Sequence, residues 1–228
     1  MTVVLFLCTI IAFLTADHFV QRARTRKVVE TVRDRVGTMV GSLKQIPSGI
    51  ELALNHLWTK REEGPVVTVG FDEFITRFFG KLERIVLPAV GDSAGKIFLT
   101  EGDRIIPLLC PVNGRVVAVN QQVLNDPGLA YADPYGGGWL FRVELRNPQP
   151  ARATVSVAPA DWLRAQVAAA REFFLHHSGA QNYALMQDGG AIVDGVLKMY
   201  DNAVWAEFGE MFLAMPSVPS TTPDAPRA

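Results

Sequence analysis

The chain has 228 residues and a formal net charge of -1, from 22 Lys and Arg against 23 Asp and Glu. This near-neutral balance gives no reason to expect nucleic acid as a partner, because phosphate recognition needs a surplus of basic side chains. Only two cysteines occur, Cys8 and Cys110, so we expect no disulfide, and a reducing compartment fits.

The N-terminal segment is apolar. Residues 2–14 carry no charge and the apolar character continues to Val20, about the length that crosses ~30 Å of hydrocarbon. A cleaved signal peptide would have a basic residue before this run and small residues after it, and neither is present. Basic residues follow instead. We therefore predict an uncleaved anchor over residues 1–21 in the inner (cytoplasmic) membrane, with residues 2–20 in the lipid bilayer, the N-terminus outside and the rest in the cytoplasm.

Residues 22–46 are predicted to form a basic, amphipathic linker helix. Val32, Val36 and Val40 recur on one helical face. Two interpretations stay open for this face: it packs on its own domain, or it lies on a membrane or a partner, helped by the basic cluster.

Strand and helix signals follow in a regular order. Residues 66–71 (VVTVGF) predict a strand, and residues 72–79 (DEFITRFF) predict a short amphipathic helix. Residues 82–92 (LERIVLPAVGD) predict a strand and a turn. Residues 159–174 predict a closing helix.

The stretch over residues 110–145 is the most informative. Asn113-Gly114 predicts a tight turn with positive φ, and residues 116–119 a β-branched strand. Residues 133–136 (DPYG) predict a turn with proline second and glycine fourth. The next strand begins at Trp139, and its alternation predicts that Trp139 and Phe141 both face the core.

This order of motifs resembles the H-protein family of the glycine cleavage system, β-sandwich proteins that carry lipoate on a lysine. The most specific signature is DPYG-x-GWL over residues 133–140. The resemblance implies an α+β fold over residues 47–176, a lipoyl/H-protein-like β-sandwich (barrel-sandwich hybrid) with flanking helices, in addition to the N-terminal transmembrane helix.

The family's lysine has no counterpart. The resemblance places it eight positions before Pro111, at Asp103, in the compact turn Glu101-Gly102-Asp103-Arg104. The neighbouring Arg104 is a guanidinium and cannot be acylated. No lysine occurs between Lys96 and Lys198. The resemblance therefore implies a degenerate lipoyl position near Asp103 and Arg104, and no cofactor.

Residues 177–215 form an extension that goes beyond the family's domain. Tyr200, Trp205, Phe208 and Phe212 lie on one helical stripe. Such a helix either covers a sheet face or docks in the groove of a partner. We propose docking, with core packing as the rival. Residues 216–228 are rich in proline and are predicted to be disordered alone.

Motifs that could carry catalysis or metal binding are weak. Residues 91–96 (GDSAGK) lack one residue of the Walker spacing, and Ile97 replaces the magnesium-binding hydroxyl. His176 and His177 diverge on a helix, which suits the dipole at a helix C-terminus better than a metal. We therefore predict no enzyme, no catalytic residues and no metal.

The sequence favours a non-catalytic, membrane-anchored accessory or assembly subunit of a larger membrane protein complex, for example a respiratory or photosynthetic one. The alternative is a carrier or small-ligand-binding module that docks lipoate-handling enzymes. The candidate partner-binding residues are Tyr200, Trp205, Phe208, Phe212, Val32, Val36 and Val40.

Overall fold

The computed structural model describes residues 43–146, 151, 153–177, 186–187, 191–192 and 194–215. The chain divides into two compact units, Met1–Leu43 with Gln187–Ala191 and Lys44–Met186 with Ile192–Ala228. The second unit carries all the elements discussed below. Two strands of two residues each, β9 (Met186–Gln187) and β10 (Ala191–Ile192), fall at the boundary between the units.

Several predicted segments lie outside the described residues: the anchor over residues 1–21, the side chains Val32, Val36 and Val40, and the tail over residues 216–228. Of the predicted linker helix, residues 43–46 are described and are not helical. Among the helices that the structure describes, none is both long enough and apolar enough to cross a membrane.

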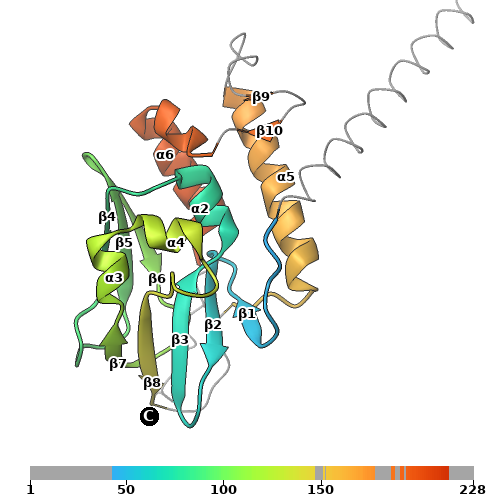
Figure 1. Cartoon of the computed structure of the whole chain (residues 1–228). Helices are drawn as coiled ribbons and strands as arrows, with labels where there is room; N and C mark the ends of the chain where they lie inside the picture. The colour runs from blue at the N-terminus through green and yellow to red at the C-terminus, as the bar shows by residue number, and fades with distance from the viewer. Residues whose placement is uncertain are drawn as a thin grey trace, which may run out of the picture. The chain divides into compact units, whose positions relative to one another are not determined.

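One antiparallel sheet has five strands in the order β1-β2-β3-β8-β7 (Figure 1). Its strands are β1 (Ile50–Leu52), β2 (Leu57–Arg61), β3 (Val66–Phe71), β7 (Gly114–Val119) and β8 (Phe141–Leu145). β3 lies in the middle, and because residues 67–71 are all buried its sequence is almost continuously apolar. Gly70 leaves room for a neighbour, since a Cβ there would lie 2.3 Å from the ring of Trp58.

A second antiparallel sheet has three strands, β4 (Arg84–Val86), β5 (Lys96–Glu101) and β6 (Arg104–Leu109). Its inner face buries Ile85, Leu99 and Leu108. Pro107 lies on β6, an edge strand, where its missing N–H interrupts no ladder. The two sheets and the helices around them confirm the expected α+β class.

The helices are α2 (Glu73–Phe79), α3 (Gln121–Asn125), α4 (Gly128–Ala132), α5 (Pro159–His177), the 3-10 turn η2 (Val196–Met199), α6 (Asn202–Phe208) and the π-helical turn η3 (Gly209–Leu213). α2 confirms the helix predicted over residues 72–79. It begins after Asp72, whose side chain accepts the N–H of Phe74 at 2.9 Å, and it ends at Gly80 with φ of 64°.

The predicted turn at Asn113-Gly114 is wrong. Neither residue has a positive φ, and Gly114 is the first residue of β7. A Cβ at Gly114 would lie 2.2 Å from the carbonyl oxygen of Glu144 on β8. Glycine is needed there because the two strands approach closely. The turn over residues 133–136 is confirmed by the hydrogen bond from Gly136 N–H to the carbonyl of Asp133.

The prediction that Trp139 reaches the core is confirmed, because Trp139 packs against the core cluster of Ile50, Leu52 and Trp58, but the strand alternation behind it is wrong. Phe141 is fully buried, and so is Leu140 between the two aromatics. Trp139 is only partly buried, and the guanidinium of Arg142 lies over its ring at 4.7 Å. Trp139 precedes the first residue of β8, so strict strand alternation does not extend to it.

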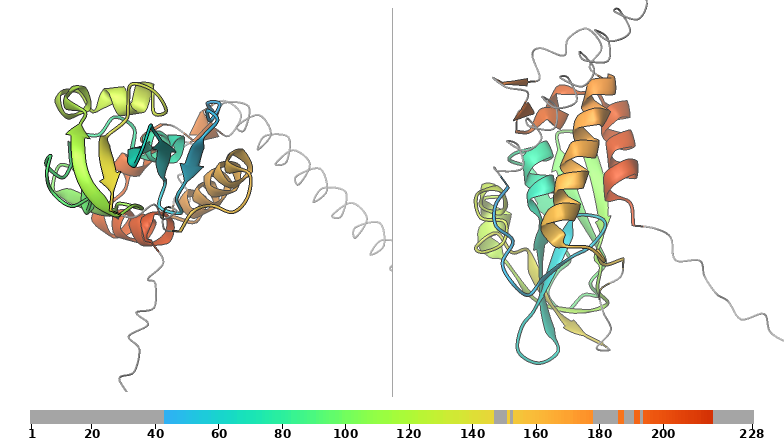
Figure 2. Two further views of the ribbon diagram at one scale, coloured as in Figure 1. Left: turned by 90° about the horizontal axis from the view of Figure 1, so that it is seen from below. Right: turned by 90° about the vertical axis from the view of Figure 1, so that its right-hand side faces the viewer.

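The C-terminal helix lies inside the domain. Trp205, Phe208 and Phe212 are 2%, 0% and 4% exposed. They pack on α2 and α5, and Figure 2 shows α5 and α6 running side by side. Tyr200 is partly buried, and its ring lies 5.3 Å from that of Phe174. The docking-surface prediction is therefore wrong for Trp205, Phe208 and Phe212, which belong to the core, and stays a prediction for the partly buried Tyr200.

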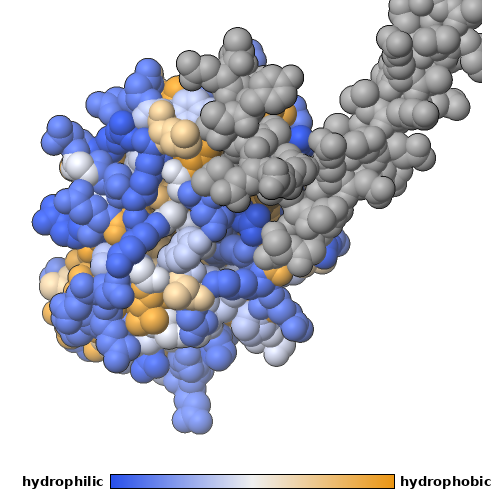
Figure 3. All heavy atoms as spheres, turned by 45° about the horizontal axis from the view of Figure 1, so that its top comes forward, coloured by the Kyte–Doolittle hydropathy of each residue, from blue (hydrophilic) through white to orange (hydrophobic). Residues whose placement is uncertain are grey.

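The centre of this cluster is Phe208. Its ring contacts aromatic rings of α2 and α5, including Phe74 at 5.7 Å, Phe174 at 5.4 Å and Phe79 at 5.9 Å. Such pairs add to the stabilisation that burial alone provides. Figure 3 shows one face of the molecule, on which hydrophilic side chains predominate and hydrophobic ones occupy small areas.

Candidate functional site

The turn at which the sequence resemblance places the family's lysine is a two-residue hairpin loop. Glu101 and Arg104 are cross-strand partners, and Gly102 and Asp103 connect β5 to β6. Gly102 has φ of 56°, whereas Asp103 does not have a positive φ, as in a type II′ turn. Both connecting residues are exposed. The compact turn is thus confirmed, with a carboxylate at the position where the resemblance expects an amine.

Acidic side chains fasten this hairpin to neighbouring parts of the domain. The carboxylate of Glu101 accepts the backbone N–H of Glu83 at 3.0 Å, and the carboxylate of Glu83 accepts the N–H of Gly102 at 2.7 Å. Glu101 also pairs with Lys198 of η2 at 2.7 Å. The Lys198 ammonium donates a further hydrogen bond to the carbonyl of Lys81. The hairpin is therefore tied to β4 on one side and to the C-terminal extension on the other.

Arg104 makes the second connection to the extension. Its Nε donates to Oδ1 of Asn202 at 2.9 Å, and its guanidinium lies 5.1 Å from the centre of the Trp205 ring. Two residues further along β6, Ile106 packs against Gly209. A Cβ added at Gly209 would lie 3.5 Å from Cδ1 of Ile106. Asn202, Trp205 and Gly209 therefore pack along the inner side of β6, from Arg104 to Ile106.

Sequence reasoning identified Asp103 and Arg104 but missed their partners. Arg104 and Asn202 are 98 positions apart, and neither residue type marks a contact on its own. The helical spacing of apolar residues in the extension predicts a helix there, but it does not indicate which surface that helix covers.

A second polar cluster surrounds the N-terminus of α2. His56 and Asp72 are fully buried, and Nδ1 of His56 lies 2.8 Å from Oδ2 of Asp72. The imidazole stacks on Phe74 with ring centroids 3.7 Å apart, and its Nε2 has no hydrogen-bond partner. His56 has φ of 62°, which is unusual for a residue other than glycine. The histidine ring is therefore packed in the core, and Asp72 and Phe74 hold it in one orientation.

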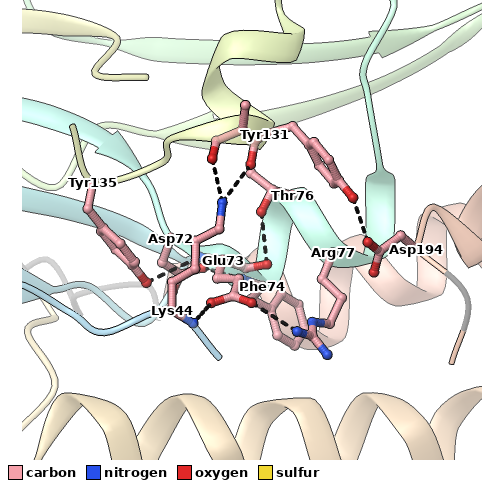
Figure 4. A network of polar contacts seen from close by, with 10 residues as sticks. Lys44, Asp72, Glu73, Phe74, Thr76, Arg77, Tyr131, Tyr135 and Asp194 are labelled. Carbon is pink, nitrogen blue, oxygen red and sulfur yellow. Dashed lines mark hydrogen bonds and ion pairs between the residues drawn. The ribbon is translucent and has the colours of Figure 1, made fainter. Parts of the chain in front are cut away.

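The cluster continues to α4 and the turn after it (Figure 4). The backbone N–H of Lys44 donates to Glu73, and its ammonium donates to the carbonyls of Tyr131 and Ala132. The hydroxyl of Tyr135 accepts the N–H of Glu73 at 3.3 Å. Burial and the charge of Asp72 raise the pKa of Tyr135 far above its ordinary value, so the phenol stays neutral. The hydroxyl of Tyr131 donates to the carboxylate of Asp194, so the network joins Lys44, α2, α4 and the segment before η2.

The remaining motifs have structural roles. The N–H groups of Gly91 and Ala94 donate to carbonyls of β7, so this loop completes a sheet edge rather than a phosphate site. Nδ1 of His177 lies 2.8 Å from the carbonyl of Phe173 at the end of α5, in agreement with the predicted dipole role. Within the described residues, no three His, Cys, Asp or Glu side chains gather as metal ligands.

The two antiparallel sheets, the helix after β3 and the β5–β6 hairpin define a lipoyl-domain-like β-sandwich. A family model described as "Glycine cleavage H-protein" matches residues 51–160. The glycine cleavage system H protein of Carboxydothermus hydrogenoformans is 37% identical over 106 residues, which cover 45% of this chain and 81% of that protein. The H protein of Bifidobacterium longum is 35% identical over 109 residues, or 46% and 79%.

A crystal structure of a glycine cleavage system H protein from Mycobacterium marinum is also similar, with a TM-score of 0.42, 25% identity, and coverage of 47% of this chain and 92% of that one. On the family match and the two relatives, this chain belongs to the glycine cleavage H-protein family.

Proposed function

We propose that this chain is a non-catalytic, membrane-anchored accessory or assembly subunit of a larger membrane protein complex, for example a respiratory or photosynthetic one. In this role a non-lipoylated H-protein-like domain serves as an interaction module. The observation that carries the proposal is the β5–β6 hairpin, whose compact turn holds Asp103, the residue that the sequence resemblance aligns with the family's lysine.

Two independent features argue against a carrier role. Lipoate attachment needs a primary amine, and no lysine occurs between Lys96 and Lys198. A carrier also needs a tip that projects freely. Here the strands beside the tip are fastened by the Glu101–Lys198 ion pair and by Arg104 on Trp205.

The membrane part of the proposal rests on the sequence. An uncharged apolar run over residues 2–14 is followed by the basic residues Arg22, Arg24, Arg26 and Lys27, the pattern of an anchor with its following domain in the cytoplasm. The alternative function is a carrier or small-ligand-binding module that docks lipoate-handling enzymes. Family membership supports it, so the two functions need a direct test.

Intact-mass measurement separates them. The full chain is coexpressed with lipoate ligase, beside the Carboxydothermus hydrogenoformans relative as a positive control. We expect the chain at its unmodified mass. Asp103→Lys is the matched variant, and a lipoyl adduct on it would show that the ligase reaches this hairpin. A lipoyl adduct on the unaltered chain would contradict the proposal and establish the carrier.

A further inference from the structure

The outer face of the β4–β5–β6 sheet is open and apolar. Val86, Phe98 and Pro107 are cross-strand partners and form one row across all three strands. Ile105 and Leu109 extend this row along β6. Val86, Leu109 and Ile105 are 39%, 38% and 61% exposed, Pro107 is exposed and Phe98 is partly exposed. We call these five residues the outer apolar face.

Two cations flank the outer apolar face. Arg84 lies in the row with Thr100 and Ile105, and Lys96 lies opposite Leu109. Both are exposed, and neither forms an ion pair with another described residue. The three strands contribute one carboxylate, Glu101, and it lies on the opposite face, where it pairs with Lys198. The outer face therefore presents apolar side chains and positive charge, without a strand carboxylate.

The extension packs on the other side of this sheet. Gly209 lies against Ile106, and Trp205 lies under Arg104, both on the inner side of β6. An apolar face beside the two cations matches an anionic bilayer surface in both polarity and charge.

We infer that the outer apolar face docks on an anionic lipid bilayer surface. Apolar side chains enter the boundary between headgroups and acyl chains, while Arg84 and Lys96 meet the lipid phosphates. This inference rests on the proposed membrane anchoring, because residues 2–20 would keep the domain at such a surface. An acidic protein surface has related chemistry, and the experiment separates it from lipid.

The test uses the full chain with Cys8→Ser, reconstituted into vesicles of equal parts phosphatidylcholine and phosphatidylglycerol. One variant carries a spin label at Ile105→Cys. The matched control carries it at Val117→Cys, an exposed valine on β7 in the other sheet. Cys110 is buried and does not compete for the label. Collisions of each label with oxygen and with a water-soluble nickel chelate are then measured.

We expect the label at position 105 to gain oxygen collisions and lose nickel collisions, and the label at position 117 to remain accessible to nickel. Arg84→Glu with Lys96→Glu should lower the docking equilibrium about thirtyfold, because each basic residue contributes measurably at an anionic surface. Vesicles of phosphatidylcholine alone should give the same loss.

Equal nickel accessibility at both positions overturns the inference while leaving the anchor intact. Shielding of position 105 in native membranes but not in lipid vesicles also overturns it, and assigns the face to a protein partner. A carbonate wash, which releases peripheral proteins, tests the anchor separately. Release of the chain would contradict the proposed anchoring. It would not contradict the docking measured before the wash.

Discussion

Asp103 and Phe208 are both candidate functional residues in the sequence, but they differ in how deeply the fold buries them. Asp103 stands at an exposed turn and makes no contact that the fold depends on, whereas Phe208 is fully buried among aromatic rings. A residue that attracts attention in the sequence therefore need not contribute much to the free energy of folding. Burial and the number of packed neighbours decide that contribution.

Asp103→Ala should change the free energy of unfolding by no more than about 0.5 kcal/mol, because exposed surface substitutions away from caps and special backbone conformations are close to neutral. Phe141→Ala, at a fully buried position of β8, should cost about 3 to 5 kcal/mol. Denaturant unfolding of both variants checks this. A damaging Asp103→Ala together with a tolerated Phe141→Ala would mean that the strand register is wrong.

His177 should make the stability of the folded domain depend on pH. Its hydrogen bond to the Phe173 carbonyl, then its contact with Glu207, raise the pKa of His177 above the ordinary value of ~6.5. A raised folded-state pKa stabilises the fold below pH ~6.5, and this contribution is lost as pH rises through the folded-state value. Melting temperatures across this window should fall with rising pH in the parent. His177→Gln should flatten this part of the profile, and an unchanged slope would assign the dependence to other groups.

At the scale of elements, the helix over Asn202–Phe208 was predictable as a helix but not as part of the core. Its apolar spacing follows from the sequence, yet the surface it meets comes from α2 and α5, far away in the chain. The helix at α2 was predictable because Asp72 and the phenylalanine spacing act locally. The His56–Asp72 pair and the Arg104–Asn202 contact were not predictable, because their residues meet only in the folded chain.

The extension should therefore behave as a structural element. Phe208→Ala should lower stability by about 3 to 5 kcal/mol, with loss of the near-ultraviolet signal of the aromatic cluster. Met211→Ala is the matched control on the same segment, because Met211 is 59% exposed. If Phe208→Ala kept the parental melting temperature and instead released the protein from its membrane assembly, the docking interpretation would have to be restored.

At the scale of the whole molecule, the domain is expected on the cytoplasmic side of its membrane. A reporter fused after Ala228 should be active in the cytoplasm, because the basic residues after residue 20 hold that side inside. Protease added to intact cells should leave the domain uncut. Periplasmic activity of the reporter would reverse the orientation and remove the argument for a reducing compartment.

The fastened hairpin has one more consequence. A free loop must become ordered whenever a partner binds it, and that loss of conformational freedom weakens the complex. In this domain the folding reaction has already ordered the loop, through Lys198, Asn202 and Trp205. A surface preorganised in this way loses less conformational entropy when a partner binds, so the same contact area gives a tighter complex.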